Sequence, residues 1–303
     1  MEVRHAFNQA MGNQLGSVMP PDPFHDFHLR LPSGFWHAIQ DHAASNGVSA
    51  GQIVRKAIAE FLDLDHHTLW QLSTSSAVVE GVFKGSLKVA DLNEHGDFGI
   101  GTFDHLDGEG VMLNGEIWQA RADGQLVRAP DDAMTPFWIA THFKEDQAFN
   151  LPHVSSFEDL GHQLDPLRPS ANVFMAIKIE GCFRRICVRS VGRVEEGTSL
   201  LTAASQQKEF VHEQLHGTLV GFWSPEYARS FNIPGYHFHF LSNDRCHGGH
   251  LLDLEAENLV AGLHLESDLK LALPQTRDFL EADLSGDPSA ALASAETGRN
   301  VKG

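Results

Sequence analysis

The stretch "GYHFHFLSNDRCHGGHLLDL", residues 235–254, predicts a β-hairpin that gathers histidines on one face. Alternate side chains of a strand share a face, so His237 and His239 point the same way, about 7 Å apart along the strand. The polar segment that follows is typical of a chain reversal, and two glycines let the backbone fold tightly before the next apolar run. The returning strand would bring His250, or His247, back towards the first pair.

Three neutral imidazoles on a rigid hairpin, with one coordination position open, are the pattern of a catalytic zinc site. A structural zinc site is less favoured, because such sites prefer thiolates and Cys182, Cys187 and Cys246 form no CxxC pair. Iron in a facial triad would require a carboxylate as the third ligand. The hairpin therefore predicts zinc, and its geometry alone leaves His247 and His250 as alternatives. Because the chain has nineteen histidines, a chance cluster is the competing interpretation.

The composition limits the class of protein. With 303 residues, the chain can bury a sizeable core in two or three domains. Its formal net charge of −18 argues against nucleic acid or an anionic membrane as a partner of the whole molecule. The N-terminus has no signal-like apolar region, no run of about 18 apolar residues occurs, and the cysteines lack disulfide-framework spacing. We therefore expect a soluble, cytoplasmic protein.

The N-terminal part of the chain differs from the rest. Residues 1–21 are polar and end in Pro-Pro, which predicts a disordered lead. Within residues 22–66, "DFHLRLP" alternates apolar and polar side chains and predicts a short strand. Two amphipathic helices are expected after it, separated by "SNGVS", in which Gly47 suits a helix C-terminus and Ser49 suits an N-cap.

A strand followed by two helices with this turn resembles a ribbon-helix-helix module. Such modules pair their strands in an intertwined dimer, and in many proteins that ribbon reads DNA. Residues 22–66 carry three basic residues against six acidic ones, a poor electrostatic footprint for DNA. We therefore expect this module to hold the chain in a homodimer or a higher oligomer, and DNA binding is not favoured.

The remaining chain is rich in strand signals. From residue 68 to about residue 149, short apolar runs alternate with Gly/Asp-rich turns, which predicts antiparallel or mixed strands. Helices are expected within 73–83 and 155–167, the latter capped by a serine. Residues 172–191 predict two strands that separate around Glu180-Gly181.

The expected fold class is mixed α+β, with mixed and antiparallel sheets and few helices. We expect one sheet-rich subdomain over residues 67–170 and a second over residues 171–303, which carries the histidine hairpin. The strand-helix-helix module of residues 22–66 precedes them.

Two further stretches carry a family resemblance. "TLWQLSTSSAVVEGVFKGSLKVADLNEHGDFGIGTFDHLDGE" and "GTLVGFWSPEYARSFNIPGYHFHFLSNDRCHGGHLLDL" resemble the acetolactate decarboxylase family, and the likeness spans about residues 67–298. The resemblance implies one zinc ion held by His237, His239 and His250. It places His247 at a position that is not a ligand in the family.

The resemblance also implies three catalytic residues. They are Glu109 in "LDGE", Arg189 in "CVRSV" and, as the nearest match to a C-terminal glutamate, Glu296 in "SAETGR". The implied reaction is zinc-dependent decarboxylation of 2-acetolactate to acetoin. Arg189 would bind the substrate carboxylate or an oxyanion through its planar fork. Glu109, in a water-poor pocket, could deliver the proton that replaces CO₂, and the sequence leaves Glu109 and Glu296 as alternatives for this step.

Two other functions compete with this one. The first is a transcription regulator in which the ribbon-helix-helix module binds DNA and the C-terminal part senses a metabolite. The second is another metal-dependent lyase, or a dioxygenase, that uses the same histidines.

Overall fold

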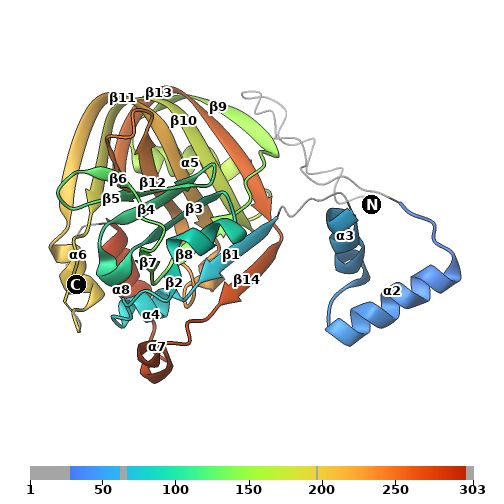
Figure 1. Cartoon of the computed structure of the whole chain (residues 1–303). Coiled ribbons are helices and arrows are strands. Elements are labelled where there is room, and N and C mark those ends of the chain that lie inside the picture. Colours follow the sequence, from blue (N-terminus) through green and yellow to red (C-terminus); the bar gives the residue numbers. More distant parts are fainter. Residues whose placement is uncertain (1–27, 62–66, 196, 298–303) are drawn as a thin grey trace.

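The computed structural model describes residues 28–61, 67–195 and 197–297. The predicted disordered lead, residues 1–21, lies outside these ranges. Within them, no helix is long and apolar enough to cross a membrane. The body of the molecule consists of mixed and antiparallel sheets with few helices, as predicted (Figure 1).

Seven strands form the first sheet, in the order β14-β1-β8-β3-β4-β5-β6. Neighbouring strands are antiparallel except β1 and β14, which run parallel. The strands are β1 (Thr68–Leu72), β3 (Phe98–Thr102), β4 (Glu109–Leu113), β5 (Glu116–Ala120), β6 (Leu126–Arg128), β8 (Trp138–Thr141) and β14 (Asp268–Ala272). Two short strands, β2 (Leu87–Lys88) and β7 (Met134–Thr135), form a separate ladder.

Five longer strands form the second sheet, which is antiparallel throughout. Their order is β10-β11-β12-β13-β9, and β10 also pairs with β13. The four strands β10, β11, β12 and β13 therefore form a closed ring of paired strands. In Figure 1 the long strands arch over the body. The strands are β9 (Gln147–Val154), β10 (Phe174–Ser190), β11 (Lys208–Ser224), β12 (Gly235–Ser242) and β13 (Gly248–Glu266). The predicted histidine hairpin is formed by β12 and β13.

Each sheet takes an edge strand from the other side of residue 170. The strand β9 precedes that residue and lies at the edge of the second sheet, whereas β14 follows it and pairs with β1 in the first sheet. The two sheets therefore interlock along the chain.

Residues 172–191 contain a single strand, β10 (Phe174–Ser190), and the prediction of two strands is wrong. The strand β10 continues through Glu180-Gly181, where its pairing with β13 shifts register between Glu180 and Cys182. The Glu-Gly pair, which resembles a turn in the sequence, stays in regular pairing with β11, and the extra residue of the β-bulge lies on β13, where Asn258 and Leu259 stand against Gly181. Because the strand is continuous, its first half packs in the core while its last residues reach the histidines.

An apolar core lies between the two sheets. Large side chains of both sheets meet there: Leu69, Phe98, Ile100, Val111 and Ile139 from the first, and Phe174, Val220, Phe222 and Leu241 from the second. A second core lies on the other face of β12, where Phe238 and Phe240 pack with residues of the helix α5 (Phe157–Leu164). Strand alternation then turns His237 and His239 towards the first sheet.

Short helices surround the sheets. Besides α5, the body has α4 (Ser75–Val79), α6 (Leu200–Ser205), α7 (Arg277–Glu281) and α8 (Ser289–Thr297), with 3-10 turns at Val89–Glu94, Asp104–Leu106, Asp165–Leu167 and Glu226–Ala228. The helices predicted within 73–83 and 155–167 correspond to α4 and α5. Thr74 and Ser156 cap them by accepting backbone N–H groups of the first turn.

The N-terminal helices are α2 (Ser33–Asn46) and α3 (Ala50–Phe61). Gly47 ends α2 in the left-handed conformation, with φ 66°, and Ser49 and Gln52 cap α3 reciprocally. The strand expected before α2 is not formed in the single chain, since residues 28–32 have no regular secondary structure. A strand requires a hydrogen-bonding partner, and within the described part of one chain this segment has none.

Candidate metal centre and active site

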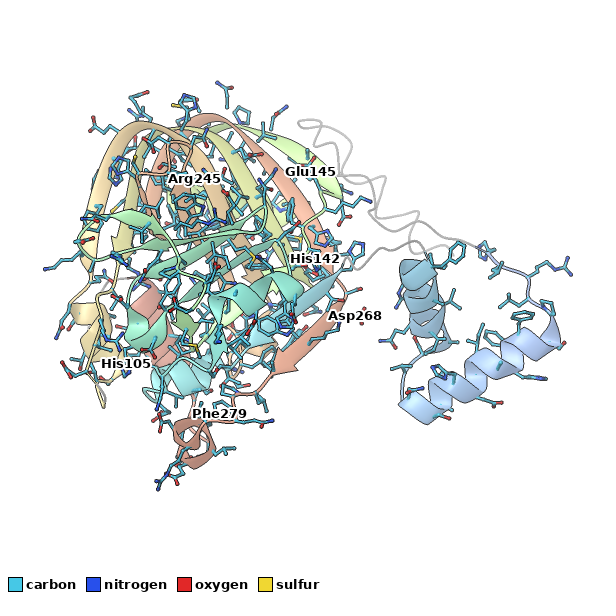
Figure 2. The ribbon with its side chains drawn as sticks, viewed as in Figure 1. His105, His142, Glu145, Arg245, Asp268 and Phe279 are labelled. Atoms are coloured by element: carbon cyan, nitrogen blue, oxygen red, sulfur yellow. The ribbon has the colours of Figure 1, made fainter. Side chains whose placement is uncertain are left out.

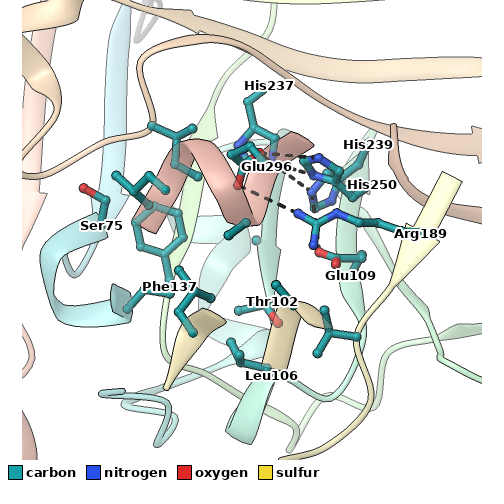
Figure 3. A pocket seen from close by; sticks show the side chains of 18 residues that line it. Ser75, Thr102, Leu106, Glu109, Phe137, Arg189, His237, His239, His250 and Glu296 are labelled. Carbon is teal, nitrogen blue, oxygen red and sulfur yellow. Dashed lines mark hydrogen bonds and ion pairs between the residues drawn. The ribbon is translucent and has the colours of Figure 1, made fainter. Parts of the chain in front are cut away.

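Two strands of the second sheet bring three histidines together. His237 and His239 share one face of β12, and His250 of β13 lies opposite His239 in the antiparallel ladder. The close approach of β13 to β10 requires a glycine at position 249, because a Cβ there would lie 2.6 Å from the carbonyl oxygen of Arg189. The glycines before His250 therefore allow the third imidazole to reach the first two (Figure 3).

The three imidazoles have the separations of ligands around one ion. The Nε2 atom of His237 lies 3.2 Å from Nε2 of His239 and 3.1 Å from Nδ1 of His250. Ligand bonds of about 2.0–2.1 Å around a tetrahedral ion place neighbouring donors at roughly such distances. All three side chains are buried. The ligand atoms of His237, His239 and His250 thus form one group that could hold a metal ion.

Burial keeps these imidazoles neutral. It lowers the pKa of His237 to about 3 and lowers the pKa values of His239 and His250 well below the usual value, with Arg189 acting in the same direction. The Nδ1 atom of His239 lies 2.8 Å from the carbonyl oxygen of Gly110 on β4. If Nδ1–H donates to this acceptor, the lone pair lies on Nε2, the atom that faces His237. The donor set fits a divalent metal ion.

The other candidate ligand of the hairpin, His247, lies elsewhere. Its backbone N–H donates to the hydroxyl of Ser242, and its ring packs against His212 with 4.2 Å between centroids. It is absent from the groups of described residues that could hold a metal. The turn therefore selects His250, because residue 247 still belongs to the reversal and residue 250 already lies in the ladder with β12.

Glu109, the first residue of β4, stands beside the histidines. Its Oε2 atom lies 3.7 Å from Nε2 of His239, and 9% of the residue is exposed. Burial raises the pKa of Glu109 to about 7, although Arg189 and the backbone N–H of Val191 favour the ionised form. The carboxyl group can therefore hold a proton near neutral pH, as a general acid requires.

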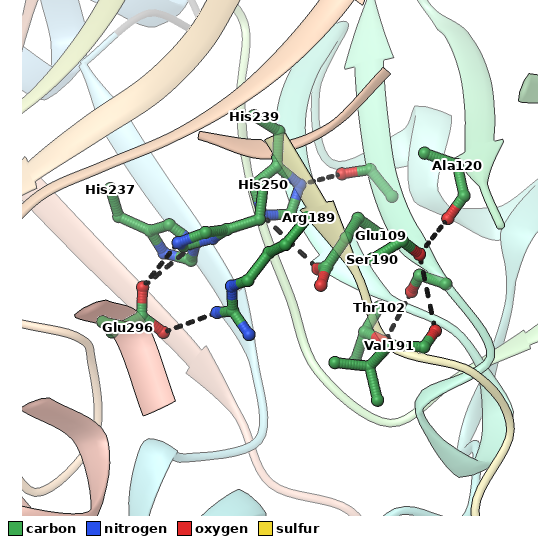
Figure 4. A network of polar contacts seen from close by, with 12 residues as sticks. Thr102, Glu109, Ala120, Arg189, Ser190, Val191, His237, His239, His250 and Glu296 are labelled. Carbon is green, nitrogen blue, oxygen red and sulfur yellow. Dashed lines mark hydrogen bonds and ion pairs between the residues drawn. The ribbon is translucent and has the colours of Figure 1, made fainter. Parts of the chain in front are cut away.

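Arg189, near the end of β10, points into the same pocket and is buried. Its Nη1 atom donates to Oε1 of Gln207 over 3.0 Å, and its Nη2 atom lies 3.9 Å from Oε1 of Glu296. Its Nε atom has no hydrogen-bond partner among the described residues. The guanidinium therefore keeps donors for an anionic ligand (Figure 4).

Glu296 reaches the site from α8, far along the chain. Its Oε2 atom lies 3.4 Å from Nε2 of His250 and 3.7 Å from Nε2 of His237. Burial raises the pKa of Glu296, and Arg189 opposes this shift. The three residues expected to be catalytic, Glu109, Arg189 and Glu296, thus lie around the same three imidazoles (Figure 4).

A cavity of about 80 Å³ adjoins these groups. The histidines, Arg189 and the two glutamates line one side. Apolar side chains from several elements line the other, among them Val78, Leu106, Phe137, Leu200 and Leu292. A small substrate there would have its polar groups against the charged wall and its carbon skeleton against the apolar wall (Figure 3).

Two residues that contact the site, Gln207 and Gly110, are not predicted by the sequence. Gln207 fixes one guanidinium nitrogen of Arg189, and its own Nε2 atom donates to Glu209. Gly110 contributes only a backbone carbonyl, to His239. A glutamine in a polar loop and a glycine in a strand carry no chemical signature. The pairing of β10 with β11, which sets Arg189 opposite Glu209, was the one indication that could have led to Gln207.

The family model for alpha-acetolactate decarboxylase matches residues 69–286. The chain belongs to this family. The alpha-acetolactate decarboxylases of Methanosarcina mazei and Methylococcus capsulatus are 43% and 38% identical to it. These alignments cover 71% and 77% of this chain, and 75% and 90% of the two relatives.

The fold agrees with that of a solved relative. The crystal structure of alpha-acetolactate decarboxylase from Bacillus subtilis strain 168 matches with a TM-score of 0.74 and 32% identity. The match covers 77% of this chain and 100% of that one. The chain is thus an acetolactate decarboxylase, and the family resemblance seen in its sequence is confirmed. The helices α2 and α3 lie before the residues that the family model matches.

Proposed function

We propose that this acetolactate decarboxylase holds a zinc ion on His237, His239 and His250 and converts 2-acetolactate to acetoin and CO₂. The observation that supports this most strongly is the convergence of three neutral, buried imidazoles beside a guanidinium and two carboxyl groups. Zinc accepts three imidazoles and keeps a position open for substrate. When bound, the ion supplies Lewis-acid polarisation of a substrate oxygen.

Arg189 binds the substrate carboxylate. Gln207 accepts a hydrogen bond from Nη1 of Arg189 over 3.0 Å. Nη2 lies 3.9 Å from Glu296, and Nε has no hydrogen-bond partner among the described residues, so both nitrogens can donate to a substrate. A planar guanidinium matches a carboxylate in two parallel hydrogen bonds, and burial strengthens both. This contact orients the bond that breaks, so that the departing CO₂ leaves from a fixed position.

Glu109 delivers the proton. When the carboxylate leaves as CO₂, the electron pair of the broken carbon–carbon bond stays on the substrate and must take up one proton to give acetoin. The pKa of about 7 lets Glu109 carry that proton near neutrality. Glu296, whose pKa is also raised, lies on the opposite side of the histidines and is the second candidate for this step.

Acetoin formation by the purified full chain tests this proposal. Protein stripped with a chelator should lose turnover of racemic 2-acetolactate, and added Zn²⁺ should restore it. Turnover by protein from which metal analysis detects no bound ion would contradict the zinc-dependent mechanism. An active metal-free enzyme would still be a decarboxylase, so the two parts of the proposal can be separated.

The N-terminal segment has a separate role in this proposal, which is self-association. Among the described side chains of residues 28–61, Ala43 is the one buried hydrophobic residue, and Phe61 is 88% exposed. Eight apolar side chains line a common groove on this unit: Leu29, Leu31, Ile39, Ile53, Val54, Ala57, Ile58 and Phe61. Two helices without a core are too small to be stable alone. A second copy of the segment would cover the groove and give Leu29 and Leu31 a strand partner, as in a ribbon-helix-helix dimer.

Removal of residues 22–66 tests this role. The truncated protein should keep its turnover per folded subunit and lose oligomeric mass in light scattering. Unchanged mass would contradict the proposal, and so would loss of turnover in a truncated protein of normal circular dichroism. DNA is not the proposed partner, because this segment is acidic. The cysteines of the described residues are all free, which agrees with a cytoplasmic enzyme.

A further inference from the structure

A second group of metal-binding side chains lies outside the catalytic pocket, where the starts of β1 and β9 meet the end of β13. His67, Asp146 and His264 each offer one ligand atom, and these atoms lie within 4.8 Å of one another. The labels of Glu145 and Asp268 in Figure 2 mark this edge of the body. We propose that these three side chains bind a second divalent transition-metal ion of the zinc type, with a structural role.

The distances suit such an ion. Nδ1 of His264 lies 3.5 Å from Oδ2 of Asp146, close to the edge of a tetrahedron whose ligand bonds are about 2.0–2.2 Å long. The ring centroids of His67 and His264 are 4.7 Å apart. In the catalytic cluster, the corresponding ring separations are 5.0, 4.9 and 5.4 Å. Two imidazoles and one carboxylate are a donor set that zinc, cobalt and iron ions accept.

The surrounding backbone orients the ligands. Nδ1 of His67 lies 2.5 Å from the carbonyl oxygen of Leu265, so an Nδ1–H donor places the ring's lone pair on Nε2. The carboxylate of Asp146 accepts the backbone N–H of Leu265 over 2.8 Å. Both contacts involve the backbone of Leu265, the residue that follows His264, and they fix His67 and Asp146 beside His264.

Glu266 supplies the independent indication of a cation. Its side chain is fully buried, and neither carboxylate oxygen has a hydrogen-bond partner of standard geometry in the described part of the chain. The Thr141 hydroxyl faces this carboxylate and interacts with it as a donor, outside standard hydrogen-bond geometry. A buried carboxylate with one poor donor costs several kcal/mol, roughly, unless a cation or a proton is near. A metal ion at this junction would provide the missing positive charge.

The position of Glu266 fits the outer shell of the site. Its Oε1 atom lies 3.9 Å from Nε2 of His264. A metal on Nδ1 of His264 puts the ring proton on Nε2, from which it can donate to Glu266. The backbone N–H of His67, now 3.2 Å from Nε2, gives up that contact when the ring is metallated. The result is a carboxylate–histidine–metal arrangement in which the buried oxygen gains its donor.

A metal here would join three segments that are distant in sequence. His67 precedes β1, Asp146 precedes β9, and His264 belongs to β13. Because the ion binds only when these segments are folded together, its binding free energy adds to the stability of the native state. The competing arrangement has no metal: a protonated His264 would lie between the carboxylates of Asp146 and Glu266 as an ion-pair network.

Metal counting on the full chain distinguishes the two arrangements. Chelator-stripped protein is loaded with Zn²⁺, dialysed against metal-free buffer and analysed by mass spectrometry for zinc per chain. The wild type should hold two ions, and His67→Ala and Asp146→Asn should each hold one. Asp146→Asn keeps an acceptor for Leu265, and His153→Ala, an exposed histidine of β9, is the matched control that should keep two.

A second readout isolates the new site from the catalytic one. His239→Ala should hold one ion, and Zn²⁺ should raise its melting temperature by several degrees. The double variant His239→Ala/Asp146→Asn should hold none, and Zn²⁺ should leave its melting temperature unchanged. Equal zinc content in the wild type, His67→Ala and Asp146→Asn would overturn the proposal and leave the ion-pair network as the explanation.

Discussion

Arg189 of β10 lies across the pocket from Glu296 of α8, with 3.9 Å between Nη2 and Oε1. This contact links the C-terminal helix to the three histidines, because the other carboxylate oxygen of Glu296 lies 3.4 Å from Nε2 of His250. Gln207 holds the same guanidinium from the opposite side over 3.0 Å. The position of Arg189 is therefore set by two side chains, one of which also contacts His250.

The first prediction concerns the shape of this cation. Arg189→Lys keeps the positive charge but loses the planar fork, so turnover should fall about 100-fold. Zinc content should stay at the wild-type level, because Arg189 is not a ligand. Acetoin formation and metal analysis on the same preparation provide the check. A lysine variant with wild-type turnover would show that the charge alone is sufficient.

Gln207 should act on catalysis only through Arg189. Gln207→Leu removes the acceptor of a charge-assisted hydrogen bond, so kcat/KM should fall roughly tenfold. The loss should appear mainly in KM if Arg189 binds the substrate carboxylate in the ground state. Gln206→Leu, next to it and exposed, is the matched control and should leave both constants unchanged. Equal kcat and KM values for the two variants would show that Gln207 has no role in catalysis.

Glu109→Gln tests proton delivery. The amide keeps the size of the side chain but carries no acidic proton, so turnover should fall by about 10²–10⁴. KM and zinc content should change little. If this variant keeps its turnover and Glu296→Gln loses it, the proton comes from the C-terminal helix. Steady-state kinetics of both variants decide between the two glutamates.

The raised pKa of Glu109 should also affect the stability of the metal-free chain. The pKa of Glu109 is about 7 in the folded state, against an ordinary value of 4.5, so the folded state keeps the proton to a higher pH than the unfolded state does. Its contribution to stability is complete below about pH 4.5 and is lost as the pH rises through about 7. The difference in unfolding free energy between wild type and Glu109→Gln should therefore change over this range, by at most about 1.4 kcal/mol per pH unit. A difference that is independent of pH in urea titrations would contradict the shift.

Much of the site follows from the period of two residues in a strand. That period places His237 and His239 on one face, and the two glycines before His250 predict the return of the chain. The hairpin alone left His247 and His250 as alternatives, since their distance from β12 depends on where the reversal ends. The carboxyl groups of Glu109 and Glu296 became candidates only through the family resemblance, because a glutamate in a turn or a tail has no distinct pattern.

Other features depend on contacts that no local pattern contains. The strand β10 continues through Glu180-Gly181 because β11 pairs with both residues and β13 pairs with β10 on both sides of its own bulge. Of the short strand expected before α2, the described residues 28–32 have no regular secondary structure in the single chain, because a strand forms only beside a partner. The contact between Gln207 and Arg189 arises from the pairing of β10 with β11. Each of these is a tertiary effect that acts after the local preferences are set.

The central claim is that three imidazoles hold the metal on which turnover depends, and a matched pair of histidine variants tests it most directly. His239→Ala and His247→Ala both remove an imidazole from the hairpin segment, but only His239 belongs to the metal group. Each protein is loaded with Zn²⁺, and competition with a chromophoric chelator measures its affinity at the catalytic site alongside acetoin formation. The account predicts that His239→Ala loses turnover and tight zinc binding at the catalytic site, whereas His247→Ala keeps both. Full turnover by a His239→Ala protein without zinc at the catalytic site would contradict it.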